Sequence, residues 1–90
     1  MDKRDANEKE IVNFWRSCGC IWIQQDRHAG FDGILICDGV ISIVEIKNPS
    51  RRWMLTEAEA AQRDEIERCG CRYRIVENLE QAAGLIGMEI

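Results

Sequence analysis

Apolar residues recur at helical spacing in the first regular segment of the chain, residues 6–18. The apolar positions are Ile11, Val12, Phe14, Trp15 and Cys18. Intervals of three and four residues place most of these side chains on one face of a helix. Asp5 and Glu8, just before the stripe, have the spacing of a capping pair. The pattern therefore predicts an amphipathic helix at the start of the chain.

Three short runs with strand character follow, at residues 20–25, 33–37 and 40–47. The last two are rich in β-branched residues, and only an Asp-Gly dipeptide at 38–39 separates them. Asp-Gly is typical of a two-residue hairpin turn. Proline in the segment 48–50 ends the second arm, because proline cannot donate to a central ladder. We therefore expect an antiparallel hairpin preceded by one further strand.

The clearest helical pattern covers residues 56–69, which open on a Thr-x-x-Glu capping box. We expect its apolar stripe at Leu55, Ala58, Ile66 and Cys69. Residues 71–77 again have strand character. Asn78 is suited to cap a last short helix over residues 79–87.

The predicted elements follow the order αβββαβα. A hairpin that receives a further strand through a helix gives a mixed sheet, and helices on its faces cover the apolar side chains. A chain of 90 residues has room for one core. We therefore predict an α/β fold with a mixed central sheet flanked by helices, in a single domain over residues 1–90.

Composition is that of a globular chain, with 46% hydrophobic and 31% charged residues. The first ten residues are polar and charged, unlike a signal peptide. No apolar run approaches the roughly 18 residues that span a bilayer. We therefore expect a cytoplasmic protein without a membrane partner.

Charge is unevenly distributed along the chain. The formal net charge of −4 argues against nucleic-acid binding over the whole surface. Residues 46–52 nevertheless carry Lys47, Arg51 and Arg52 and no acidic residue. This basic loop is a candidate for contacts with phosphates.

Five cysteines are present, four of them in the tripeptides Cys18-Gly19-Cys20 and Cys69-Gly70-Cys71. These four could ligate one zinc ion. Each tripeptide also stands where a helix ends and a strand begins, and glycine is common there as the residue after a helix. We prefer the second interpretation and keep zinc as an alternative.

The two-residue turn fixes the register of the predicted hairpin. If Cys37 faces Val40, then Asp32 faces Glu45, and their side chains share one face of the sheet. Lys47 lies two residues further on the same face, because side chains alternate. Charges could also mark an exposed edge strand. The run 40–47 is, however, apolar on both faces except at these positions, as expected of a buried strand.

Two facing carboxylates in a half-buried sheet repel each other unless one is protonated or a cation lies between them. A hard divalent ion such as Mg²⁺ suits the place, because it takes one or two carboxylates and keeps several waters. Such an ion can activate water and offset charge on a phosphoryl group. The pattern therefore predicts a metal site at Asp32 and Glu45.

An aspartate, a hairpin and then Glu-x-Lys at the end of an apolar strand resemble the PD-(D/E)XK nuclease superfamily. Within it, the chain is most similar to the small stand-alone VRR-NUC domains of phages and bacteria. The resemblance covers nearly the full length and includes "GFDG", "VEIKNP", "LTEAEAAQ", "RCG" and "RIVENLEQAAGLIG". It implies a restriction-endonuclease-like core.

The resemblance also implies roles for residues of the site. Asp32, Glu45 and the backbone carbonyl of Ile46 would ligate Mg²⁺ or Mn²⁺, and Lys47 would be the catalytic lysine. A glutamate of the first helix would reach the metal through water. Glu8 fits this role better than Glu10, because Glu8 lies on the apolar stripe; helix capping is its alternative role.

Two departures from the family pattern affect the site. Phe31 stands where a proline usually precedes the aspartate. The family often has a functional glutamine on the following helix; alignment places Glu59 there, and Gln62 follows one turn later. Helical spacing favours Gln62 as the inward residue, where its amide needs a partner such as Lys47 or a phosphate.

We therefore expect a metal-dependent endonuclease that hydrolyses DNA phosphodiester bonds, with Glu8, Asp32, Glu45, Lys47 and Gln62 in its site. The Lys47–Arg52 loop would hold the DNA backbone, which favours recognition of DNA structure over sequence. The resemblance implies a homodimer acting on junction-like or branched DNA, and we expect no small-molecule cofactor. The alternatives are a non-cleaving nucleic-acid-binding module with the same fold and a small cysteine-ligated zinc protein that binds other proteins.

Overall fold

The computed structural model describes residues 6–26, 30–49 and 54–88. Its elements are, in chain order, α1 (Ala6–Ser17), β1 (Ile21–Gln24), β2 (Gly33–Cys37), β3 (Val40–Ile46), α2 (Glu57–Arg68), β4 (Arg72–Val76) and α3 (Leu79–Leu85). The predicted α/β class and the order αβββαβα are confirmed. Within the described ranges, no helix is long and apolar enough to cross a membrane.

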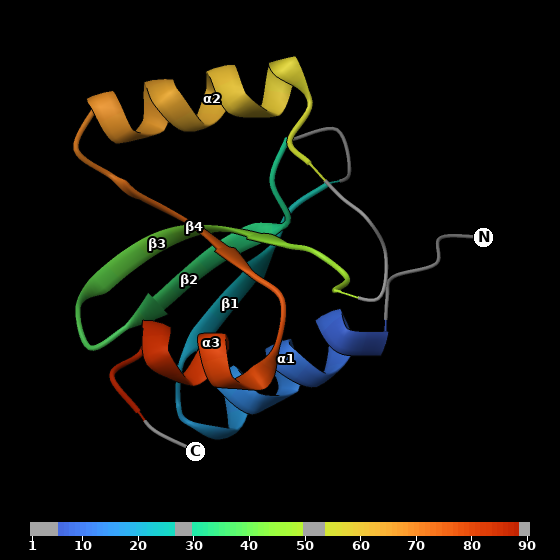
Figure 1. The fold of residues 1–90 in the computed structure, drawn as a ribbon. Coiled ribbons are helices and arrows are strands. Elements are labelled where there is room, and N and C mark those ends of the chain that lie inside the picture. The colour runs from blue at the N-terminus through green and yellow to red at the C-terminus, as the bar shows by residue number, and fades with distance from the viewer. Residues whose placement is uncertain (1–5, 27–29, 50–53, 89–90) are drawn as a thin grey trace.

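The four strands form one mixed sheet in the order β1-β2-β3-β4. β2 pairs antiparallel with both β1 and β3, whereas β4 pairs parallel with β3. A parallel pair needs a crossover connection, and α2 supplies it (Figure 1). β3 therefore lies inside the sheet. The alternative in which Glu45 and Lys47 mark an exposed edge strand is wrong.

The hairpin turn has the conformation that its sequence predicts. Asp38 has φ 51° and Gly39 has φ 77°. Positive φ at both central residues defines the type I′ turn, whose twist matches that of the two strands. The resulting register pairs Cys37 with Val40 and Gly33 with Val44. This confirms the predicted register.

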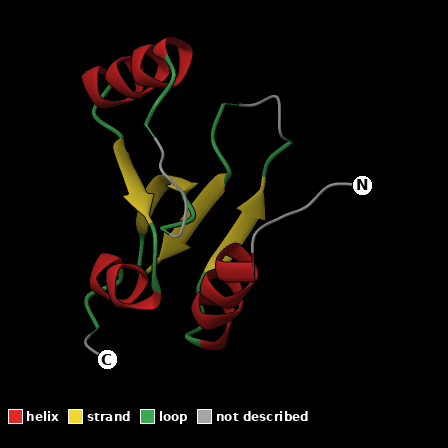
Figure 2. Ribbon diagram, turned by 45° about the vertical axis from the view of Figure 1, so that its right-hand side comes forward, coloured by secondary structure: helices red, strands yellow, loops and turns green. Residues whose placement is uncertain are grey.

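One face of the sheet is covered by α1 and α3, which lie side by side against it (Figures 1 and 2). Trp15 of α1 is fully buried there; its ring centroid lies 5.3 Å from that of Trp22. Its Nε1–H donates to the Ala82 carbonyl of α3 at 3.0 Å. The core of this helix-covered face consists of Ile11, Val12, Trp15, Cys20, Trp22, Leu35, Val44, Ile46, Val76 and Ala82.

The other face carries isoleucines at the alternating positions. The register aligns Ile21, Ile36 and Ile41 in one cross-strand row, and Ile23, Ile34 and Ile43 in the next. Ile21, Ile41 and Ile23 remain 56%, 55% and 44% exposed. We refer to these six residues as the isoleucine surface. It contrasts with the helix-covered face, where Trp22, Leu35 and Val44 are buried.

α2 lies on the side of the sheet opposite α1 and α3 (Figure 1) and contacts chiefly β4. None of its residues is fully buried. The predicted stripe is wrong at Ala58 and Cys69, which are exposed, whereas Ile66 is half-buried. Capping and apolar spacing located the helix correctly. These patterns did not determine which side of the helix faces the sheet, because α2 covers only part of the sheet.

Candidate active site

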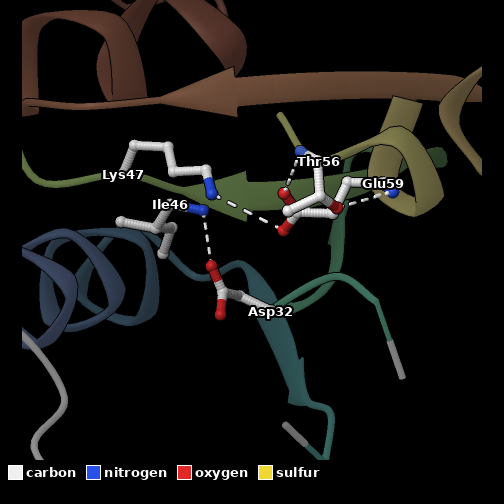
Figure 3. A network of polar contacts seen from close by, with 5 residues as sticks. All are labelled: Asp32, Ile46, Lys47, Thr56 and Glu59. Atoms are coloured by element: carbon white, nitrogen blue, oxygen red, sulfur yellow. Dashed lines mark hydrogen bonds and ion pairs between the residues drawn. The ribbon is translucent and has the colours of Figure 1, made fainter. Parts of the chain in front are cut away.

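The hairpin brings Asp32 and Glu45 together. Asp32 directly precedes β2, and Glu45 is the next-to-last residue of β3. The regular register ends at the pair of Gly33 with Val44. Beyond it the Asp32 N–H donates to the Val44 carbonyl at 3.0 Å, so Asp32 leaves the ladder, but its side chain is still hydrogen-bonded to that of Glu45. The Ile46 N–H donates to Asp32 Oδ2 at 2.6 Å (Figure 3). The carboxylate of Asp32 is therefore held by the backbone of the strand that carries Glu45.

Glu45 is only 7% exposed although it can ionise. Burial raises its pKa to about 9, and the hydrogen bond to the Asp32 side chain and the charge of Asp32 act in the same direction. The positive charge of Lys47 opposes this rise in pKa but does not cancel it. At neutral pH Glu45 therefore keeps its proton and shares it with Asp32. A cation between the two oxygens would replace that proton.

Lys47 follows β3 directly and pairs with α2. Its Nζ lies 3.5 Å from Glu59 Oε2 (Figure 3). The other carboxylate oxygen of Glu59 accepts from the Thr56 N–H at 2.9 Å, in the predicted capping box. Burial opposes ionisation of Glu59, but the hydrogen bond from the Thr56 backbone and the charge of Lys47 lower its pKa. Glu59 thus links the start of α2 to the lysine.

Gln62 lies one turn further along α2 and is half-buried. Its side chain packs closely against Gly30, so a Cβ at that position would collide with the amide. Gly30 also has φ 87°, a conformation that favours glycine. Gln62 is therefore close to the segment that leads into Asp32. Its catalytic role stays a prediction.

The first turn of α1 approaches the same end of β3 from the helix-covered face. Asn7 Nδ2 donates to the Lys47 carbonyl at 2.8 Å and to the Glu77 carbonyl at 3.2 Å. Glu8, next in sequence, is 7% exposed, whereas Glu10 is exposed. The choice of Glu8 over Glu10 as the inward glutamate agrees with this burial. Its role at a metal stays a prediction.

Tyr73 of β4 is a neighbour of the site that sequence reasoning missed. It is 3% exposed, and its hydroxyl has no hydrogen-bond partner within the described residues. Burial raises its pKa to about 12, and the charges of Glu45, Glu59 and Asp32 add to the effect. The signal in the sequence that could have pointed to Tyr73 was a tyrosine in a short strand that also carries basic residues. Only the parallel pairing of β3 with β4 places it beside these carboxylates.

Few side chains of the described residues are placed to ligate a metal ion directly. Across residues 6–26, 30–49 and 54–88, no three acidic, histidine or cysteine side chains are grouped to hold a metal ion. Cys18, Cys20, Cys69 and Cys71 are therefore not assembled as a zinc site. Two carboxylates with a neighbouring backbone carbonyl suit an ion that keeps several waters. Arg51 and Arg52 of the basic loop lie outside the described residues.

Comparison with known proteins adds one finding. A solved structure described as a "VRR_NUC domain" superposes with a TM-score of 0.69 at 18% sequence identity, over 88% of this chain and 88% of that one. No family model matches the sequence. No curated protein matches it either. The chain therefore has the fold of a VRR-NUC-type domain, the restriction-endonuclease-like fold that the resemblance implied.

Proposed function

We propose that this protein is a metal-dependent endonuclease that hydrolyses DNA phosphodiester bonds. The observation that carries the proposal is the pair of adjacent carboxyl groups, Asp32 and Glu45, with Lys47 two residues after Glu45. The VRR-NUC-type fold supports the same reaction class. Because fold alone does not define chemistry, the proposal rests on this set of side chains.

The residues present fit a divalent cation. Glu45 is buried, its pKa is raised to about 9 and it shares a proton with Asp32, so the site gains when a cation takes the proton's place. We assign Asp32, Glu45 and the Ile46 carbonyl as ligands of Mg²⁺ or Mn²⁺. When bound, such an ion supplies positive charge to the scissile phosphate and favours ionisation of water. Glu8 would act at longer range, through water.

Lys47 is positioned for the phosphate. Its ammonium group lies at the end of β3, where Glu59 holds it in place through an ion pair of 3.5 Å. It would donate hydrogen bonds to the scissile group and stabilise the charge that develops there. Gln62, one turn along α2, would contact the neighbouring phosphate or its water. Lys47, Arg51 and Arg52 would together hold the DNA backbone.

We further propose that the enzyme is a homodimer that selects junction-like or branched DNA. Backbone contacts from a basic loop read the shape of DNA more than its sequence. The isoleucine surface supports the dimer because three of its isoleucines are about half exposed. It lies on the face of the sheet that also carries Glu45. A second copy packed here about a twofold axis would form an isologous interface.

The test incubates the wild type and Lys47→Ala with branched and linear DNA of the same sequence in the presence of Mn²⁺. We expect the wild type to cut branched DNA, with a loss of roughly a hundredfold to a thousandfold in the variant, the usual effect of removing one group that stabilises developing charge. Lys9→Ala, which removes an exposed lysine of α1, is the matched control. No cleavage by the wild type, or equal cleavage by wild type and Lys47→Ala, would contradict the proposal.

A further inference from the structure

Two cysteines face each other at the end of the sheet opposite the carboxylates. Cys37 is the last residue of β2, and Cys20 directly precedes β1. The register of these strands pairs Ile21 with Ile36. One further step places Cys20 opposite Cys37. Cys20 and Cys37 belong to different segments of the sequence, and only the pairing of β1 with β2 brings them together.

The position along the ladder is the kind that accepts a disulfide. The Gln25 N–H donates to the Asp32 carbonyl at 2.9 Å, which marks that pair as hydrogen-bonded. Hydrogen-bonded and non-hydrogen-bonded pairs alternate, so Cys20 and Cys37, five steps away, form a non-hydrogen-bonded pair. The Cys20 N–H accordingly donates to the Trp15 carbonyl instead. Cα atoms in such pairs are about 4.5 Å apart, within the range that a disulfide spans.

The thiols differ in their surroundings. Cys20 belongs to the core and is 7% exposed, whereas Cys37 is half-buried. Burial raises the pKa of Cys20 to about 12, and a hydrogen bond between the two thiols contributes to the shift. Cys37 is therefore the more accessible of the two sulfurs for an oxidant from solvent.

A cavity gives a small molecule access to Cys37. It has a volume of about 230 Å³ and lies between the hairpin, the start of β4 and the end of α3. Its wall includes Cys37, Ser42, Arg72 and Ile86. The space is large enough for a peroxide, which occupies little more volume than a water molecule. The exposed Cys69 and Cys71 flank Gly70 at a turn and do not line this cavity.

We propose that Cys20 and Cys37 are a reversible disulfide-forming pair that responds to peroxides. The sulfur of Cys37 attacks hydrogen peroxide, the O–O bond breaks, and sulfenic acid and one water form. Cys20 then attacks that sulfur and gives its proton to the departing hydroxyl, which leaves as a second water. Two thiols are oxidised to one disulfide while one peroxide is reduced. The bond fastens the edge strand β1 to β2.

The test treats the purified full chain with hydrogen peroxide, then counts thiols in denaturant and maps linked peptides by mass spectrometry. We expect a fall from five free thiols to three, a Cys20–Cys37 peptide, and full reversal by dithiothreitol. The oxidised protein should melt at least roughly 5 °C higher, because the bond constrains the unfolded chain. None of these measurements depends on nuclease activity.

Variants sharpen the assignment. Cys71→Ala should still form the bond, whereas Cys37→Ala should form none and show no rise in melting temperature. Mapping in the wild type decides the question even if a cysteine variant folds poorly. Five remaining thiols after treatment, a disulfide between Cys69 and Cys71 in place of the proposed one, or oxidation of Cys37 without a bond to Cys20 would each overturn the proposal.

Discussion

The two faces of the central sheet are built from similar apolar residues but are used differently. On the helix-covered face, Trp15, Leu35 and Val44 are at most 2% exposed, and α1 and α3 close the core. On the opposite face, the isoleucine surface stays partly open, and α2 covers only the part near β4. Glu45 lies near the end of that open face. Stability is therefore concentrated on one side of a single sheet, whereas the buried glutamate of the candidate site lies on the other.

Leu35→Ala tests whether the helix-covered face carries most of the stability. Removing a buried leucine side chain leaves a cavity in a closed core and costs roughly 2–5 kcal/mol of unfolding free energy. Ile41→Ala is the control, because Ile41 is 55% exposed. It should cost about 1 kcal/mol or less in the monomer. Urea unfolding at low protein concentration measures both; equal losses would mean that the two faces are equally packed.

Ile41→Lys tests the use of the open face. A charge in the middle of an apolar interface remains unpaired when buried, so self-association should weaken at least about a hundredfold. Sedimentation velocity across protein concentrations measures the change. Met54→Lys is the control, because Met54 is 81% exposed and lies outside the sheet. A dimer that survives Ile41→Lys unchanged would place the contact elsewhere.

The carboxylate pair predicts a pH dependence of stability. The pKa of Glu45 is raised from 4.5 to about 9 on folding, so the folded state binds the extra proton. Stability from this group is full below about pH 4.5 and is lost as the pH rises through about 9. Urea midpoints of the metal-free protein should therefore fall over this window, and Glu45→Gln should reduce the fall. Added Mn²⁺ should stabilise the wild type most at high pH.

Glu80→Gln, which changes an exposed glutamate of α3, is the control for that experiment. It should leave the pH profile of the urea midpoint as it is in the wild type. A Glu45→Gln profile that matches the wild type would show that burial of Glu45 does not control the titration.

The smallest expected effect comes from Glu59→Gln. Glutamine at this position keeps the capping box but removes the charge that faces Lys47. Stability should change by about 1 kcal/mol or less, as for other partly exposed ion pairs. Cleavage should fall severalfold if the pair positions the lysine. Glu57→Gln, in the same helical turn but exposed, is the control; equal cleavage rates for the two variants would mean that Glu59 acts only in capping.

Local patterns predicted the elements and the hairpin correctly because both depend on neighbours in the sequence. Asp38-Gly39 specifies a type I′ turn, and the turn sets the hairpin register as far as the pair of Gly33 with Val44, next to Asp32 and Glu45. The docking of α2 was not predictable in this way. Its helical spacing favoured Ala58 as an inward residue, but Ala58 is exposed, because the helix contacts chiefly β4 and little of the sheet. Alignment with the family pattern had placed Glu59 at the functional helix position, but its ion pair with Lys47 is seen only in the fold.

The sequence by itself determined the order of the elements, the hairpin register and therefore the pair of carboxylates with a lysine beyond them. Each follows from short-range rules of turns, caps and alternation. The tertiary structure decided which groups from distant elements reach that pair: Glu59 from α2, Tyr73 from β4 and Asn7 from α1. It also decided that one face of the sheet is closed while the other remains open. These features depend on packing between segments far apart in the chain, which no local pattern records.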